Sequence, residues 1–137
     1  MMGRAHTHKL EIRTASRTHL LDITGEIRKL VEAAGAVSGI CHLYVPHTTA
    51  GILINEGDDP SVAADIGAAL ARLAPMEGPY KHMEGNSDAH IKAALVGSSE
   101  SVFIEHGQLL MGRWQAIFFC EFDGPRDREL HVRITSD

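Results

Sequence analysis

The sequence predicts a single α+β domain, and three observations carry that prediction. The chain has 137 residues, which is within the range of one domain with one hydrophobic core. Segments in which apolar residues alternate are mixed with segments in which they recur at helical spacing. The last part of the chain contains only strand-like segments separated by turns rich in glycine. This order is typical of an α+β domain over residues 1–137 and not of a regular βαβ series.

The predicted strands share an alternating or continuously apolar pattern bounded by turn residues. They cover residues 8–14, 37–45, 50–54, 101–104, 114–122 and 129–135. Residues 50–54 are apolar on both faces, which predicts a buried central strand. The turns between the last strands are expected at 107–112 and at Gly124-Pro125.

The predicted helices each have a capping residue before an apolar run at helical spacing. They begin at Thr24, at Asp59-Pro60 and at Ser87 or Asp88, and they end at Gly35, at Pro75 and near Gly97. Between the second and third helices, residues 75–88 show no periodicity and contain two Pro and two Gly. A loop of this length in a compact domain is typical of a functional segment.

Composition argues against several classes of function. The net charge is −5 and no Lys/Arg cluster exceeds a pair, which argues against a nucleic-acid partner. The first nine residues are polar, and no apolar run reaches membrane-spanning length. Cys41 and Cys120 lie in apolar segments without a CxxC motif, which favours reduced, buried thiols. We therefore expect a soluble cytoplasmic protein with a small-molecule substrate.

Histidine is the residue that most suggests a site, because the chain has nine. Imidazole is the usual protein ligand of zinc. His47 follows a predicted strand, His82 lies in the long loop, and His90 begins the third helix eight residues later. Ligands on a loop and at a helix start can converge on one divalent ion, although any one of them alone is more often a surface or hydrogen-bonded histidine. The remaining histidines are interpreted in that structural way: His6, His8, His19, His42, His106 and His131.

A run of oxygen-bearing side chains follows the buried strand 50–54. Asp59 can cap the next helix and Asp58 can solvate a turn, but Asn55 and Glu56 have no evident structural role. Loops at strand ends often carry sites. A carboxylate beside imidazoles and a metal can act as a general base. Glu56 and Asn55 are therefore the candidate catalytic residues.

Four ordered motifs resemble the YjbQ-like family. They are His47-Thr48-Thr49-Ala50, Asn55-Glu56 followed by Asp59-Pro60, Ala89-His90-Ile91-Lys92, and Gly107-x4-Gly112-x-Trp114-Gln115. The resemblance covers about residues 8–135. It implies an α+β fold with a mixed, partly open barrel-like sheet, a homotrimer, and histidines that can hold a metal. It points to His47, Asn55, Glu56, His82, His90, Trp114 and Gln115. Arg113 departs from the family pattern, where a small hydroxyl residue or Gly is expected.

The resemblance also suggests a function, because some members of this bacterial and archaeal family are described as having secondary thiamine-phosphate synthase activity. In that reaction a thiazole phosphate attacks a pyrimidine methyl carbon as diphosphate leaves. A divalent ion held by His47, His82 and His90, with zinc first and magnesium as the alternative, would stabilise the leaving charge. The competing hypotheses are a non-catalytic metal- or ligand-binding trimer and a phosphate-ester hydrolase.

Overall fold

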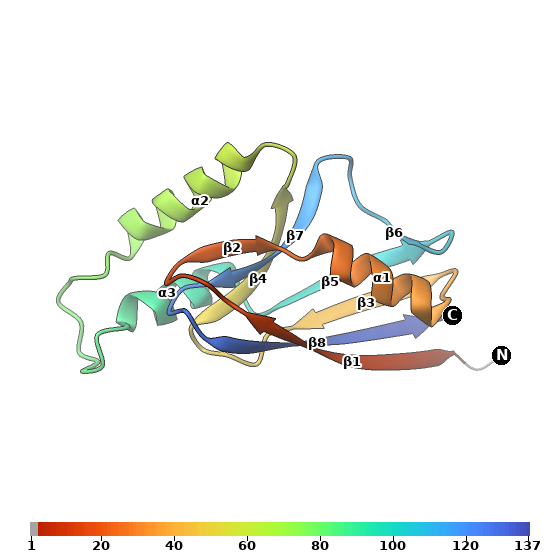
Figure 1. Ribbon diagram of the computed structural model, residues 1–137, viewed down its shortest axis with the longest axis horizontal. Helices are drawn as coiled ribbons and strands as arrows, with labels where there is room; N and C mark the ends of the chain where they lie inside the picture. The colour runs from red at the N-terminus through yellow and green to blue at the C-terminus, as the bar shows by residue number, and fades with distance from the viewer. Residues whose placement is uncertain (1–2) are drawn as a thin grey trace.

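The computed structural model describes residues 3–137 as two antiparallel sheets and three helices (Figure 1). The larger sheet has the order β1 (Arg4–Arg13), β8 (Asp127–Ser136), β3 (Gly39–Tyr44), β5 (Ser99–Glu105) and β6 (Gln108–Leu109). The smaller sheet has the order β2 (His19–Asp22), β7 (Gln115–Glu121) and β4 (Ala50–Glu56). The helices are α1 (Thr24–Ala34), α2 (Pro60–Leu73) and α3 (Ser87–Val96).

The main core lies between the two sheets, and α1 fills it. Ile27 and Val31 of α1 pack with apolar side chains of both sheets, such as Leu130 from β8 and Ile52 from β4. The sheets curl around this core as a partly open, barrel-like structure, which confirms the predicted α+β class. Every strand pair within residues 3–137 is antiparallel.

A second apolar layer covers the other face of the smaller sheet. Phe118 and Phe122 pack there against Ala89 and Ala93 of α3 and Leu70 of α2. Leu70 is the buried residue of α2, although that helix is rich in Ala, Val, Ile and Leu. In Figure 1, α2 runs along the outside of the molecule, away from α1. This face of the fold therefore leaves an apolar helix poorly covered.

Local sequence signals explain most helix ends. Gly35 ends α1 in the left-handed conformation, with φ 67°, and the Asp59 carboxylate accepts from the Ser61 backbone N–H at 3.0 Å. The prediction that Thr24 caps α1 is wrong, because Thr24 is already helical. Its hydroxyl instead accepts from the Ile117 N–H at 2.9 Å, which ties α1 to β7.

The start of α3 also differs from the prediction. Its cap position is Asn86, and neither Ser87 nor Asp88 caps it, because both are already helical. The four-residue β2 and the two-residue β6 were not predicted. Both cysteines are free and buried, as expected, and burial raises the pKa of the Cys41 thiol to about 11 and that of Cys120 to about 12. Within residues 3–137, no helix combines the length and apolar character needed to cross a membrane.

Candidate functional site

The loop between β3 and β4 carries His47, and a strand end holds its ring. β3 ends at Tyr44, which pairs with His131 of β8. Residues 127–130 of β8 extend beyond this pair and have no partner on β3. The Glu129 backbone N–H, just beyond the last β3 pair, donates to Nε2 of His47 at 2.9 Å. A buried backbone donor without a strand partner must find another acceptor. His47 is therefore fixed in orientation by the sheet edge.

A buried ion pair lies behind this loop. Arg128 donates through Nε to Glu121 Oε1 at 2.8 Å and through Nη2 to the Thr49 hydroxyl at 2.8 Å. The Thr14 hydroxyl donates to the same Glu121 oxygen at 2.7 Å. Burial by itself raises the pKa of Glu121, but the hydrogen bonds from Arg128 and Thr14 outweigh it and hold that pKa below its ordinary value. This pair was not predicted from the sequence, although a Glu at the end of an apolar strand was a visible signal of it.

The environment of His47 favours its neutral form. Burial is the main influence that lowers the pKa of His47, and the positive charge of Arg128 lowers it further. The carboxylates of Glu129 and Glu121 act in the opposite direction and do not compensate. The lowered pKa favours the neutral imidazole over its charged form.

His82 and His90 come together at the start of α3. Their ring centroids are 5.4 Å apart, and the rings meet edge to face. They share a cleft of about 500 Å³ with Lys81 and Ser87. His90 also lines an adjoining hollow of about 370 Å³ together with His47. The eight-residue spacing of His82 and His90 thus does place the two rings side by side, and His90 stands between His82 and His47.

A network of charges holds the start of α3 in place. Asp88, which is fully buried, accepts from Lys92 Nζ at 2.8 Å and from Arg17 Nη2 at 2.9 Å. Burial raises the pKa of Asp88, but these two cations outweigh it, so that pKa lies below its ordinary value. Asp123 joins the network by accepting from the Asn86 side-chain amide at 2.9 Å. The network joins α3 to the β1–β2 loop and the β7–β8 turn, and so it positions His90.

Asn55 and Glu56 lie at the opposite end of β4 from His47. Glu56 pairs with Gln115 of β7, and its carboxylate accepts from the Asp58 N–H at 2.7 Å. The Asn55 amide oxygen accepts from the Glu56 N–H at 2.7 Å. A strand rises about 3.4 Å per residue, so the length of β4 puts roughly 20 Å between its two ends. Within one chain the structure does not bring the carboxylate to the histidines.

The turn before β7 accompanies Glu56. The Gln115 amide oxygen accepts from the Gly112 N–H at 2.8 Å, which provides the partner that an amide on this strand requires. Trp114 is half exposed, and the Arg113 guanidinium lies 4.7 Å from the centroid of its ring. The indole and guanidinium stack as a cation–π pair. The residue that departs from the family pattern therefore covers the exposed Trp.

The residues present fit a metal ion only in part. Catalytic zinc sites usually use three protein ligands. Across residues 3–137 there is no group of three or more His, Cys, Asp or Glu side chains placed to hold an ion. His82 and His90 are adjacent, but Nε2 of His47 already accepts a backbone hydrogen bond. Within one chain the imidazoles of His82 and His90 are neighbours, and His47 lines a hollow together with His90.

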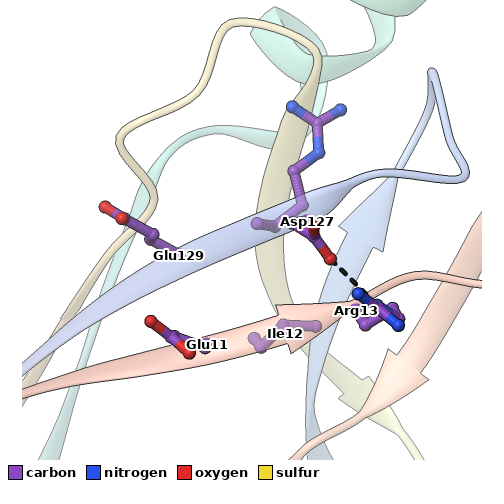
Figure 2. Close-up of a pocket in the computed structure, with 6 residues that line it drawn as sticks. Glu11, Ile12, Arg13, Asp127 and Glu129 are labelled. Atoms are coloured by element: carbon purple, nitrogen blue, oxygen red, sulfur yellow. Dashed lines mark hydrogen bonds and ion pairs between the residues drawn. The ribbon is translucent and has the colours of Figure 1, made fainter.

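A further hollow of about 440 Å³ lies where β1 and β8 pair. Figure 2 shows Arg13 bonded to Asp127 there, with the carboxylates of Glu11 and Glu129 pointing to the same side. Glu11 and Glu129 are direct cross-strand partners, and Lys9 Nζ lies 3.5 Å from Glu129 Oε1. Like charges directly opposite each other destabilise a sheet unless a cation compensates. Nothing there resembles a binding centre as strongly as the histidine cleft does.

Comparisons with known proteins agree on one family. Residues 8–137 match the family model described as UPF0047 protein YjbQ-like. The chain is 51% identical over 129 residues to the UPF0047 protein MJ1081 of Methanocaldococcus jannaschii, covering 94% of each chain. It is 44% identical to the UPF0047 protein YugU of Bacillus subtilis, covering 91% of this chain and 96% of that one.

Solved structures give the same result. A YjbQ/UPF0047 family protein from Clostridium acetobutylicum superposes with a TM-score of 0.91 at 48% identity, covering 93% of this chain and 98% of that one. A YbjQ-like protein from Sulfolobus solfataricus superposes with a TM-score of 0.95 at 31% identity, covering 99% and 100%. The similarity spans both sheets and all three helices.

Proposed function

Because this chain belongs to the UPF0047 YjbQ-like family, we propose that it binds a phosphorylated small molecule beside α3 and acts as a transferase with thiamine-phosphate synthase activity. The observation that carries the proposal is the pairing of His82 and His90 next to Lys81 in one cleft at the start of α3. Imidazole N–H groups, an ammonium and the backbone N–H groups of a helix start all bind phosphate oxygens.

The chain's own residues would act on the leaving diphosphate. In the proposed reaction the thiazole nitrogen forms a bond to the pyrimidine methyl carbon while the carbon–oxygen bond to diphosphate breaks. Negative charge then grows on the diphosphate, and Lys81 with the first N–H groups of α3 would stabilise it. The Asp88 carboxylate in that first turn does not oppose this, because Lys92 and Arg17 neutralise it.

We further propose that His82 and His90 hold a divalent ion, with zinc preferred for imidazole ligands and magnesium as the alternative. When bound, such an ion supplies positive charge to the phosphate oxygens. Its remaining ligands would come from the substrate, since one chain places two imidazoles there. His47, the third predicted ligand, is considered below.

Asn55 and Glu56 can serve this cleft only from another copy of the chain. We propose a homotrimer in which the Asn55–Glu56 end of one subunit lies against the histidine cleft of the next. Large apolar side chains are exposed at both ends of this proposed contact, which supports it. They are Leu73 at 71%, Met76 at 56% and Leu95 at 57% on the α2–α3 side, and Trp114 at 51% beside Glu56.

The experiment is to purify the protein, measure bound metal, and assay turnover of thiazole phosphate with pyrimidine diphosphate before and after chelation. We expect metal-dependent turnover that His90→Ala abolishes. His131→Ala is the matched control, because His131 lies on β8 opposite Tyr44 and outside the cleft. Full turnover in the His90→Ala protein would contradict the proposal.

One observation favours a non-catalytic binding protein instead. The separation of Glu56 from the histidines leaves the cleft of a single chain without that predicted base, which also weakens the hydrolase hypothesis. A binding protein would retain inorganic pyrophosphate through His82, His90 and Lys81 but show no turnover. The same assay, combined with calorimetric titration of pyrophosphate, separates the two functions.

A further inference from the structure

We infer that His47 is a fixed hydrogen-bond donor in the hollow it shares with His90, with its proton on Nδ1, and that it is not a metal ligand. The donor would meet an oxygen of the bound molecule, which is a phosphoryl oxygen if the proposed function holds. Such a donor would orient the bound molecule. The position of the ring proton follows from hydrogen-bond geometry alone.

The valence of the imidazole ring determines which nitrogen carries the proton. A neutral imidazole has one nitrogen with a free lone pair and one that carries a proton. In His47 the lone pair of Nε2 accepts the Glu129 backbone N–H at 2.9 Å. The proton must then be on Nδ1, and that nitrogen has no lone pair to offer a metal. Coordination by His47 and its bond to Glu129 exclude each other.

Backbone hydrogen bonds hold the loop that carries His47. Both ends of the β3–β4 loop are tied to the fold: the Val45 N–H donates to Ser98 O at 2.8 Å, and Thr49 O accepts from the Phe122 N–H at 3.1 Å. Glu129 itself lies in β8, paired with Glu11 of β1. If the ring turned toward an ion, the Glu129 N–H would lose its acceptor, at a cost in stability. The loop therefore favours the observed ring position.

The charged groups that act on His47 are Arg128, Glu129 and Glu121, and the Arg128 guanidinium is held in place by Glu121 and Thr49. A second proton on the ring would sit on Nε2, directly facing the N–H of Glu129. Burial and Arg128 lower the pKa of His47, which supports the same conclusion. The hydrogen bond that Nε2 accepts requires the neutral ring, whose one proton is then on Nδ1.

The remaining donor, Nδ1 of His47, is accessible. Within residues 3–137 the buried polar side-chain atoms that lack a partner belong to His8, His19 and Asn86, so Nδ1 of His47 is not sealed inside the protein. His47 lines the hollow of about 370 Å³ with Thr48, Ser98 and His90. An N–H group and two hydroxyls around a small space fit an oxygen acceptor.

Nuclear magnetic resonance of the full-length protein with ¹⁵N-labelled histidine tests the tautomer directly. Two-bond ¹H–¹⁵N correlations report which ring nitrogen carries the proton, and the spectrum of His47→Gln assigns the signals. We expect Nδ1 of His47 to be protonated. On titration with zinc, the signals of His82 and His90 should change while the His47 tautomer stays the same. A proton on Nε2 of His47, or loss of its Nδ1 proton on zinc addition, would overturn the inference.

Two substitutions separate the donor from the acceptor. His47→Gln can still reach the Glu129 N–H with its amide oxygen but removes the Nδ1 donor. His47→Asn is too short for that acceptor. We expect His47→Gln to keep its melting temperature and zinc content but to bind inorganic pyrophosphate about tenfold more weakly, as expected for the loss of one hydrogen bond to an anion. His47→Asn should melt at a lower temperature.

Loss of zinc in His47→Gln, or unchanged pyrophosphate affinity, would refute the inference. Failure of the proposed function has a different signature. In that case His90→Ala would alter neither zinc content nor pyrophosphate affinity, while the tautomer of His47 would still be read from its own signals. The donor role of His47 and the proposed function can therefore be refuted independently.

Discussion

The guanidinium of Arg128 and the carboxylate of Glu121 face each other inside the protein, with Nε of Arg128 2.8 Å from Oε1 of Glu121. Their side chains are 5% and 0% exposed. Thr14 and Thr49 complete the hydrogen bonds around the pair. Because the positive charge of Arg128 also lowers the pKa of His47, the pair connects the interior of the fold to the candidate site. Several predictions can be tested on this connection and on the surfaces around it.

Replacing Arg128 with Met should strongly destabilise the protein. The substitution leaves the Glu121 carboxylate buried without its cation, and removing one partner of a buried pair costs about 3–5 kcal/mol. The free energy of unfolding from urea denaturation measures the effect. The double variant Arg128→Met with Glu121→Leu should recover most of the loss, because it removes both charges. Equal stability of the single and double variants would show that the charge on Glu121 is not the cause.

Acid should destabilise the protein through Glu121 and Asp123. For both, the folded pKa lies below its ordinary value, because hydrogen bonds and cations outweigh burial. The stability they contribute is therefore present above the unfolded pKa of about 4 and is lost as pH falls below it toward the folded pKa. Unfolding free energies measured from pH 6 downward (roughly one unit per step) should drop steeply below about pH 4. Glu121→Gln should start less stable but lose less on acidification, and an unchanged slope would contradict this assignment.

The sequence predicted much of the fold because its signals are local. A run that is apolar on both faces predicted β4, and the Asp59 cap with Pro60 predicted the start of α2. The four residues of β2 are too few for periodicity, so that strand depends on its pairing with β7. The role of Thr24 was mistaken because its hydroxyl bonds to a strand far along the chain. Signals within one segment cannot reveal such contacts.

The candidate site was predictable to a smaller extent for the same reason. The spacing of His82 and His90 brings their rings together, since a loop and the helix start that follows it are neighbours. Glu56 was grouped with the histidines because it and His47 both lie near strand ends, but these two residues lie at opposite ends of β4. The pairing of Glu121 with Arg128 depends on how two strands pack, and no motif marks it. The metal assignment itself remains a prediction.

A charge on the exposed end of α2 should disrupt the proposed trimer. Leu73 is 71% exposed at the end of an apolar helix that buries little of its surface. Leu73→Asp would place a carboxylate in that contact at a desolvation cost. Size-exclusion chromatography with light scattering should show the molar mass of the assembly falling to that of a monomer. Val37→Asp is the matched control, because Val37 is 66% exposed but precedes β3, away from α2. Dissociation by both variants, or by neither, would argue against this surface.

Two inactive variants should complement each other if Asn55 and Glu56 act on a neighbouring subunit. Glu56→Gln keeps the size of the side chain and removes its charge, whereas His90→Ala removes a cleft imidazole. Each variant alone should lose turnover. In Glu56→Gln the histidine cleft is intact, so its zinc content should match the unmodified protein; in His90→Ala it should fall.

Mixing the two variants under conditions that exchange subunits tests the arrangement directly. A mixed trimer contains contacts in which an intact Glu56 from one subunit faces an intact His90 from the next. If the ends of β4 meet between subunits, turnover should reappear at roughly the fraction of contacts that random assembly makes intact. If both residues act within one chain, no contact in the mixture is complete, and the mixture should stay inactive. Mixing His90→Ala with His82→Ala is the matched control, because both changes damage the same cleft. Turnover in the control mixture as well would show that subunit exchange alone cannot separate the two arrangements. Absence of turnover in both mixtures would refute the shared site.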